Sequence, residues 1–113
     1  MLKGEIYITR FPLGGTVGVK NRPTLLLAGP TGSVPEYLTA YISTAIPDPL
    51  LPSDLILDPS TPEHASTNLK LRSVIRLHKL STVHQRDIFR RLGDVAPAVW
   101  LEVEAKLRNY LGL

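Results

Sequence analysis

The placement of proline sets the strongest limit on the structure of this chain. Five of the ten prolines in its 113 residues lie between residues 44 and 62. Proline has no backbone N–H and its ring clashes with the preceding helical turn, so this stretch can form neither a helix nor a central strand. We expect a surface connection in which the short apolar run at residues 54–57 pairs as an edge strand. The stretch serves either as a plain connection or as a loop that contacts a partner.

Three other segments are rich in β-branched, aromatic or apolar residues and are predicted to be strands: residues 5–11, 24–28 and 37–43. Turn-forming residues fill the interval 29–35, which predicts a loop. Along residues 37–43 apolar and polar side chains alternate. Tyr41 and Ser43 therefore share a polar face, opposite the side chains that enter the core.

The clearest two-residue period runs through residues 69–78. Seven of the 13 basic residues lie between residues 70 and 91, against a single acid. Such a concentration of positive charge suits a phosphate backbone or an acidic protein, and it is also found on solvated surfaces. The predicted core face carries Leu69, Leu71, Ser73, Ile75 and Leu77, and the other face carries Lys70, Arg72, Val74, Arg76 and His78.

The last third of the chain has the period of a helix. Thr82 and Gln85 fit a capping box, which predicts a helix that buries Ile88, Phe89 and Leu92 and ends at Gly93. A second helix is predicted from Pro97 to a C-cap at Gly112. The elements together predict a single α+β domain over residues 1–113, with a small antiparallel barrel or strongly bent sheet and two C-terminal helices.

The composition argues against several classes of protein. There is no cysteine, and the three histidines lack the spacing of a zinc site, so neither a metal site nor a cofactor is expected. No apolar run approaches the roughly 18 residues of a membrane span, and the first residues are too polar for a signal peptide. We therefore expect a cytoplasmic protein that does not enter a membrane.

One arginine is held at a defined position. Arg22 precedes Pro23 at the start of the predicted strand 24–28, and proline restricts the residue before it to extended conformations. The loop at residues 13–21 carries three glycines and is expected to be a mobile flap over whatever Arg22 contacts. The Arg22-Pro23 pair is either the anchor of a binding site or an ordinary start to a strand.

Several motifs, in this order along the chain, resemble the MazF/PemK (Kid) toxins of type II toxin–antitoxin systems. The resemblance covers nearly all of residues 3–112. It implies an SH3-like antiparallel β-barrel with C-terminal helices (MazF/CcdB-like), a homodimer, and a cognate acidic antitoxin of the MazE/PemI kind. It also implies sequence-specific, metal-independent cleavage of single-stranded RNA. The motifs are Gly4-Glu5-Ile6-Tyr7, Phe11-Pro12, the glycine loop, Asn21-Arg22-Pro23, Ile42-Ser43-Thr44, Ser73-Val74-Ile75-Arg76 and Leu80-Ser81-Thr82-Val83.

The resemblance also suggests roles for individual residues. Arg22 matches the arginine of the family's Arg-Pro motif, and Ser43 and Thr44 stand where the family usually has Thr and then Ser. His78 stands where the PemK/Kid branch has an acid, which leaves the identity of the general base open. The residues expected to contact RNA are Thr16, which replaces a loop histidine of that branch, together with Lys20, Asn21, Tyr41, Arg72 and Arg76.

Cleavage of RNA by its own 2′-OH leaves 2′,3′-cyclic phosphate and 5′-OH ends. It needs a group that accepts the 2′-OH proton, a group that protonates the leaving 5′-oxygen, and fixed donors for the charge on the phosphoryl oxygens. The planar guanidinium of Arg22 suits the last role. Ser43 would donate a hydrogen bond to a phosphoryl oxygen, with Thr44 as the alternative. His78 is the candidate acid or base, because the ordinary pKa of histidine lies near neutrality.

Two other functions fit the same features. A CcdB-like toxin would inhibit DNA gyrase by binding, without cutting RNA. A non-catalytic small-barrel module would bind RNA with a steep dependence on salt and leave it intact.

Overall fold

The computed structural model describes residues 1–12 and 20–113. In these residues six strands precede one α-helix, and two short 3-10 helices lie between strands. The elements are β1 (Glu5–Phe11), β2 (Lys20–Thr31), β3 (Glu36–Ser43), β4 (Asp54–Leu57), η1 (Pro62–Thr67), β5 (Ser73–His84), η2 (Gln85–Asp87), β6 (Ile88–Asp94) and α1 (Pro97–Leu111).

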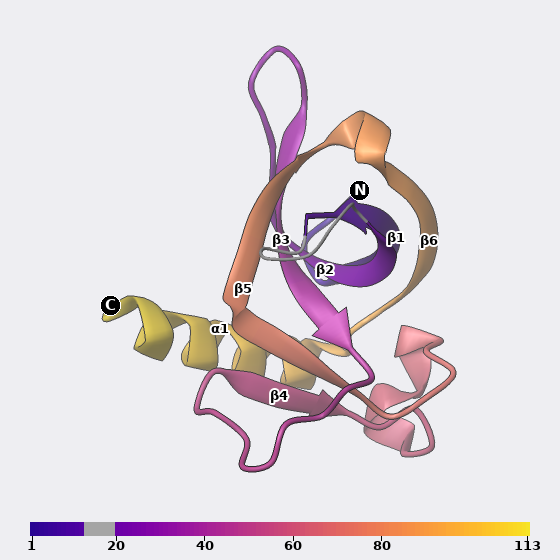
Figure 1. The fold of residues 1–113 in the computed structure, drawn as a ribbon, viewed down its shortest axis with the longest axis vertical. Coiled ribbons are helices and arrows are strands. Elements are labelled where there is room, and N and C mark those ends of the chain that lie inside the picture. Colours follow the sequence, from indigo (N-terminus) through magenta and orange to yellow (C-terminus); the bar gives the residue numbers. More distant parts are fainter. Residues whose placement is uncertain (13–19) are drawn as a thin grey trace.

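All six strands belong to one antiparallel sheet with the order β4-β5-β3-β2-β1-β6. The sheet curls strongly around β1 and β2, while the β2–β3 hairpin extends away from the body (Figure 1). The pairing between β3 and β5 is interrupted between Ala40 and Tyr41. Such irregularities bend a strand and increase its twist. The predicted α+β fold with a strongly bent antiparallel sheet is confirmed, and the sheet ends at β4 and β6 without closing.

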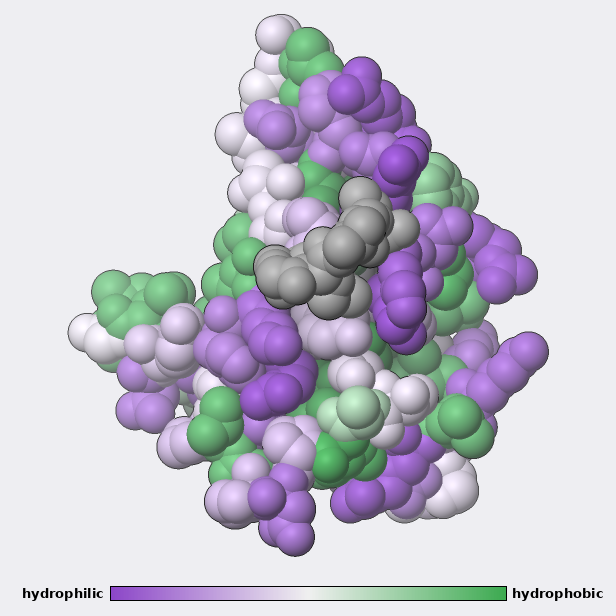
Figure 2. Space-filling model, in the orientation of Figure 1, coloured by the Kyte–Doolittle hydropathy of each residue, from purple (hydrophilic) through white to green (hydrophobic). Residues whose placement is uncertain are grey.

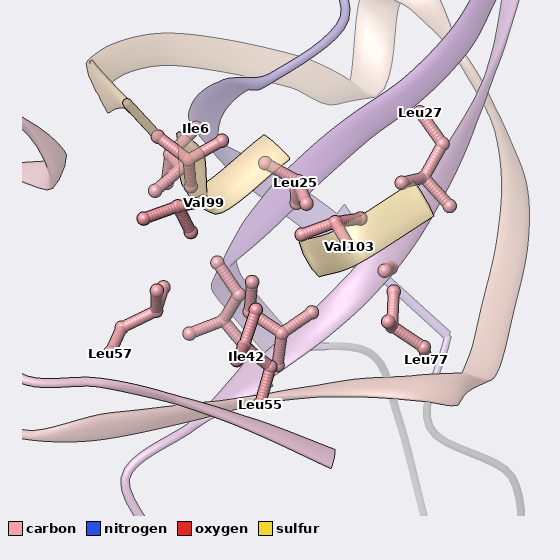
Figure 3. Packing of buried hydrophobic residues seen from close by; sticks show 12 residues of the cluster. Ile6, Leu25, Leu27, Ile42, Leu55, Leu57, Leu77, Val99 and Val103 are labelled. Carbon is pink, nitrogen blue, oxygen red and sulfur yellow. The ribbon is translucent and has the colours of Figure 1, made fainter. Parts of the chain in front are cut away.

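Helix α1 covers one face of the sheet and completes the main core. Val99 and Val103 are almost completely buried and face Ile6 and Leu25, as Figure 3 shows. Burial of an aliphatic side chain of this size contributes about 1.5–3 kcal/mol. Leu26 points to the other face of β2 and packs in a smaller cluster with Tyr37, Val83 and Ile88. The long strand β2 therefore has core on both faces.

The helix predicted between Thr82 and Gly93 is wrong. Strand β5 continues to His84, η2 follows without a side-chain capping bond, and β6 then pairs with β1. The capping-box pattern is a local preference, whereas pairing with β1 satisfies the backbone of β6 and buries Ile88. Phe89, predicted to be inside, is 52% exposed.

The strand predicted at residues 69–78 begins later, at Ser73. Asn68 has a left-handed backbone with φ of 53°, and residues 69–72 form the connection that follows it. Leu71 is therefore exposed rather than buried, and Val74 is buried rather than exposed. Burial alternates as predicted only over residues 75–78, where Ile75 and Leu77 are buried and Arg76 and His78 are half-buried.

Most of the other predicted elements are present. Strands form at residues 5–11, 37–43 and 54–57, while the strand predicted at 24–28 extends over residues 20–31 and takes in part of a predicted loop. Helix α1 begins at Pro97 as predicted, and Gly112 ends it with φ of 74°. In the described residues, no helix is long and apolar enough to cross a membrane.

Candidate functional site

Arg22 lies near the start of β2, opposite Thr9 of β1. Its side chain is half-buried, and its Nε atom is buried without a hydrogen-bond partner in the part of the chain that the structure describes. Beside it, the hydroxyl of Thr24 donates a hydrogen bond of 2.8 Å to that of Thr9, and both threonines are fully buried. A buried donor without a partner costs about 1–3 kcal/mol, and more when it is charged. An anion that reached Arg22 would remove this cost.

Ser43 lies at the end of β3, on the same face of the sheet as Arg22. The pairing of β2 with β3 includes Thr24 opposite Tyr41. Two residues further along this antiparallel register, Arg22 and Ser43 occupy corresponding positions. The Ser43 hydroxyl oxygen accepts a hydrogen bond of 3.0 Å from the backbone N–H of Ala45, so its own O–H can still donate.

Thr44 takes a different direction from Ser43. It lines a cavity with Pro23, on the other side of the strand ends. This geometry favours Ser43 over Thr44 as a neighbour of Arg22. Lys20 and Asn21 are exposed at the start of β2, and Thr16 lies outside the described residues.

Tyr41 lies next to Thr24, where two buried aromatic rings meet an exposed lysine. Its ring stacks on Phe11, with the centroids 5.4 Å apart, and both residues are buried. The ammonium group of Lys79 lies 5.7 Å from the Tyr41 ring centroid. The rings are thus buried and support Lys79, whereas the sequence predicted Tyr41 on a polar face as a contact to RNA.

Lys79 is a basic residue that the sequence interpretation missed at this site. A strict two-residue period would place it on the opposite face from Arg76. However, the β3 partner changes from Leu80 to Arg76 between Ala40 and Tyr41, so residues 77–79 of β5 have no partner on β3. This irregularity lets Lys79 reach the ring of Tyr41. The residue pattern of β5 does not predict the irregularity.

Arg76 lies opposite Tyr41 and is held by an ion pair. Its Nε donates a hydrogen bond of 2.8 Å to Asp54 of β4, whose side chain is completely buried. The backbone N–H of Leu51 donates to the other carboxylate oxygen of Asp54. Asp54 therefore fixes the position of Arg76 and balances its charge, whereas Lys79 and Arg22 have no ion pair in the described residues.

His78 belongs to a separate cavity between β5 and the C-terminal part of α1. Its Nδ1 atom is 3.3 Å from the Ser53 hydroxyl, and its ring meets Tyr110 edge to face at 6.4 Å. Burial, and next the positive charge of Arg76, lower the pKa of His78 below its ordinary value. The ring is therefore neutral at neutral pH, and its contacts do not include Arg22 or Ser43.

The remaining predicted contact, Arg72, is exposed in the connection before β5 and lines a shallow cavity with Asp58. Hydrophilic side chains gather over the middle of β5 and over its connection to β6 (Figure 2). The described residues contain no group of three His, Cys, Asp or Glu side chains placed to hold a metal ion. The structure thus brings together Arg22, Ser43, Tyr41 and Arg76, and places His78 and Arg72 outside that group.

A model of the protein family described as PemK-like, MazF-like toxins of type II toxin–antitoxin systems matches residues 2–111. Among curated proteins, none matches this chain significantly in sequence. Several solved structures share its fold.

An endoribonuclease from mycobacterial species has a TM-score of 0.73 and 18% identity, with 100% of this chain and 92% of that chain covered. The Mycobacterium tuberculosis toxin MazF-mt6 has a TM-score of 0.74 and 21% identity, with 96% and 97% covered. A mycobacterial endoribonuclease in complex with its cognate antitoxin has a TM-score of 0.71 and 21% identity, with 100% and 96% covered. At these identities, the likeness shows that the fold is shared.

Proposed function

Because this chain belongs to the PemK-like, MazF-like toxin family of type II toxin–antitoxin systems, we propose that it is a metal-independent endoribonuclease that cleaves single-stranded RNA. The observation that carries the proposal is the buried Nε of Arg22, which has no hydrogen-bond partner among the described residues, on the face that also holds Ser43. Two of the proteins with this fold are described as endoribonucleases, which supports the same reaction here.

In the proposed reaction, Arg22 binds the phosphoryl oxygens of the cleaved bond. Its guanidinium offers several donors in one plane, and a partly buried position strengthens their effect on the charge that develops in the transition state. The O–H of Ser43 donates to a phosphoryl oxygen. Lys79, supported by the ring of Tyr41, attracts a neighbouring phosphate.

Proton transfer in this proposal is assigned to His78, and Thr44 is the alternative to Ser43 as the hydroxyl that donates to a phosphoryl oxygen. His78 follows Arg76 by two residues, and its lowered pKa keeps it neutral and able to accept the 2′-OH proton. The leaving 5′-oxygen then takes a proton from the protonated His78 or from water. The contacts of His78 with Ser53 and Tyr110 mean that it must act from the cavity beside α1. A pH profile, described in the Discussion, tests this assignment.

The proposal extends to partners of the toxin. A protein with the same fold forms a complex with its cognate antitoxin, and this chain offers cations to an acidic antitoxin of the MazE/PemI kind. Lys20, Asn21, Thr16 and Arg72 would add contacts to RNA. We further propose that the toxin acts as a homodimer in the cytoplasm, where its RNA substrate is found.

The deciding experiment incubates the purified protein with a long single-stranded RNA in excess EDTA and identifies both new ends. We expect discrete cuts with 2′,3′-cyclic phosphate and 5′-OH ends. Arg22→Ala should lower the cleavage rate by about a thousandfold or more, since removal of one preorganised donor already costs about 10²–10³. Its circular dichroism and urea midpoint should show a folded protein.

Arg108→Ala is the matched control, because it removes one exposed arginine of α1 and should cut RNA at the wild-type rate. Uncut RNA would overturn the proposal and direct attention to gyrase inhibition or to RNA binding without cleavage. Cleavage by Arg22→Ala at the wild-type rate would overturn the role of Arg22.

A further inference from the structure

A cavity of about 310 Å³ lies beside Arg22, on the other side of the strand ends. Pockets that hold small molecules have volumes of about 300–1,000 Å³ and are mostly apolar, with a few polar groups at defined positions. This cavity has that composition. Its apolar wall includes Pro23, Leu69 and Leu92, and its polar positions include Thr44, Lys70 and Arg90.

The cavity and the candidate cleavage site are joined by two pairs of consecutive residues. Arg22 and Pro23 are neighbours in β2, and successive side chains of a strand point to opposite faces. Ser43 and Thr44 are neighbours at the end of β3. In each pair the first residue belongs to the candidate site and the second lines the cavity. A chain bound at Arg22 would need to cross only the strand ends to reach the cavity.

The charges at the cavity favour a ligand that carries an anion. Lys70 and Arg90 are both exposed, and neither forms an ion pair within the described part of the chain. Apolar walls next to free cations match a nucleotide, which has a flat base and a phosphate. Bases of single-stranded RNA can be splayed out of the chain, so that protein pockets can accept them.

We propose that this cavity binds a nucleotide of the RNA substrate next to the cleaved bond, with the base against Pro23, Leu69 and Leu92 and its phosphate on Lys70 and Arg90. The inference rests on the proposed ribonuclease function and extends it to substrate recognition. It assigns Lys70 and Arg90 to binding rather than to a solvated surface.

Asn68 adds a preference among bases. Its side-chain Nδ2 donates a hydrogen bond of 2.8 Å to the carbonyl of Leu92, which leaves Oδ1 as an acceptor at the cavity. Cytosine, adenine and guanine carry an exocyclic amino group that can donate to this oxygen, whereas uracil has no such group and could donate only its ring N3–H. Cytidine and uridine monophosphates therefore form a matched pair of probes.

The test is a titration of the full chain with cytidine monophosphate, uridine monophosphate and inorganic phosphate, followed by amide NMR signals. We expect cytidine monophosphate to shift the signals of residues 68–71 and 90, to bind more tightly than uridine monophosphate, and to exceed phosphate alone. Lys70→Gln/Arg90→Gln should weaken its binding about tenfold or more, because two charge-assisted contacts are lost. Arg86→Gln/Arg108→Gln removes the same charge from exposed sites that do not line the cavity and should bind like the wild type.

Absence of these shifts at millimolar nucleotide, or equal weakening in both double variants, would overturn the inference. Equal binding of the two nucleotides would overturn the role of Asn68. Because binding is measured without cleavage, the two proposals fail separately. If the protein cuts RNA but does not bind nucleotides, the proposed ribonuclease function holds and the inference about the cavity fails. If it binds nucleotides but does not cut RNA, the cavity is a nucleotide site and the proposed function fails.

Discussion

His78 differs from Arg22 in its surroundings although both were predicted to serve one reaction. Arg22 has a buried nitrogen that lacks a partner within residues 1–12 and 20–113, and its position follows from Pro23 and the pairing of β1 with β2. His78 already has Ser53 and Tyr110 as neighbours. A residue with satisfied contacts is more often structural, so the role of His78 depends on a direct measurement.

If His78 transfers the proton, kcat/KM for RNA should fall as pH falls through its pKa. Burial and Arg76 place that pKa below the ordinary value of 6.5, so the inflection should lie on the acid side of 6.5. The measurement is the rate of cleavage of a short RNA between about pH 5 and 8. His84→Ala is the control, since it removes a different half-buried histidine. A profile that is the same in His78→Ala and the wild type would exclude His78 from proton transfer.

At the scale of elements, the sequence predicts best where the local pattern and the tertiary contacts agree. Strands 5–11 and 37–43 and helix 97–111 show this agreement. Residues 82–93 show the opposite, because their local capping pattern competes with pairing to β1. Strand β1 lies far earlier in the chain, so a short stretch of sequence around residues 82–93 cannot reveal this pairing. Lys79 was missed for a related reason: its position depends on an irregularity in the pairing of β3 with β5.

Gly93 is constrained by close packing and not by the end of a helix. It was predicted to end a helix, but it lies in β6 against the backbone of η1. A Cβ atom added at Gly93 would come within 2.2 Å of the Ser66 carbonyl oxygen and 2.6 Å of that of Thr67. Backbone atoms cannot move aside as the end of a side chain can, so glycine is required here.

We therefore expect Gly93→Ala to lower the free energy of unfolding by about 3 kcal/mol, at the upper end of the range for overpacking. Gly112→Ala is the matched control, because a Cβ there meets nothing within 4 Å and only the left-handed backbone opposes it. That variant should lose only about 1 kcal/mol. Urea unfolding measures both values, and equal losses would contradict the role of close packing at Gly93.

At the scale of the whole molecule, an ionic contact joins strands from the two ends of the chain. Arg91 of β6 donates hydrogen bonds of 2.6 Å to Glu5 of β1 and 2.9 Å to Asp94. Partial burial raises the pKa of Glu5, but the bonds from Arg91 and from the N–H of Leu2 outweigh it, so the pKa lies below its ordinary value of 4.5. The hydrogen bond from Ser60 likewise lowers the pKa of Asp58.

The stability of this protein should therefore fall over two ranges of pH as the solution is made more acidic. His78 has a folded pKa below 6.5, so the unfolded chain binds more protons and stability falls as pH drops from 6.5 through the folded value. Glu5 and Asp58 act in the same direction below their ordinary values of 4.5 and 3.8. Urea midpoints measured from neutral pH to below 4 should show the fall in both ranges. Glu5→Gln should flatten the fall in the more acidic range, and Glu102→Gln, an exposed control on α1, should not.

The open ends of the sheet have a consequence for how this protein behaves when it is abundant. Exposed sheet edges are templates for adding strands from other molecules. On β6, the carbonyls of Leu92 and Asp94 already accept hydrogen bonds from Asn68 and Ser66. On the opposite edge, β4 has only four residues and lies between Pro52 and Pro59. Both edges thus offer only short stretches of free backbone, which disfavours the addition of strands from other molecules.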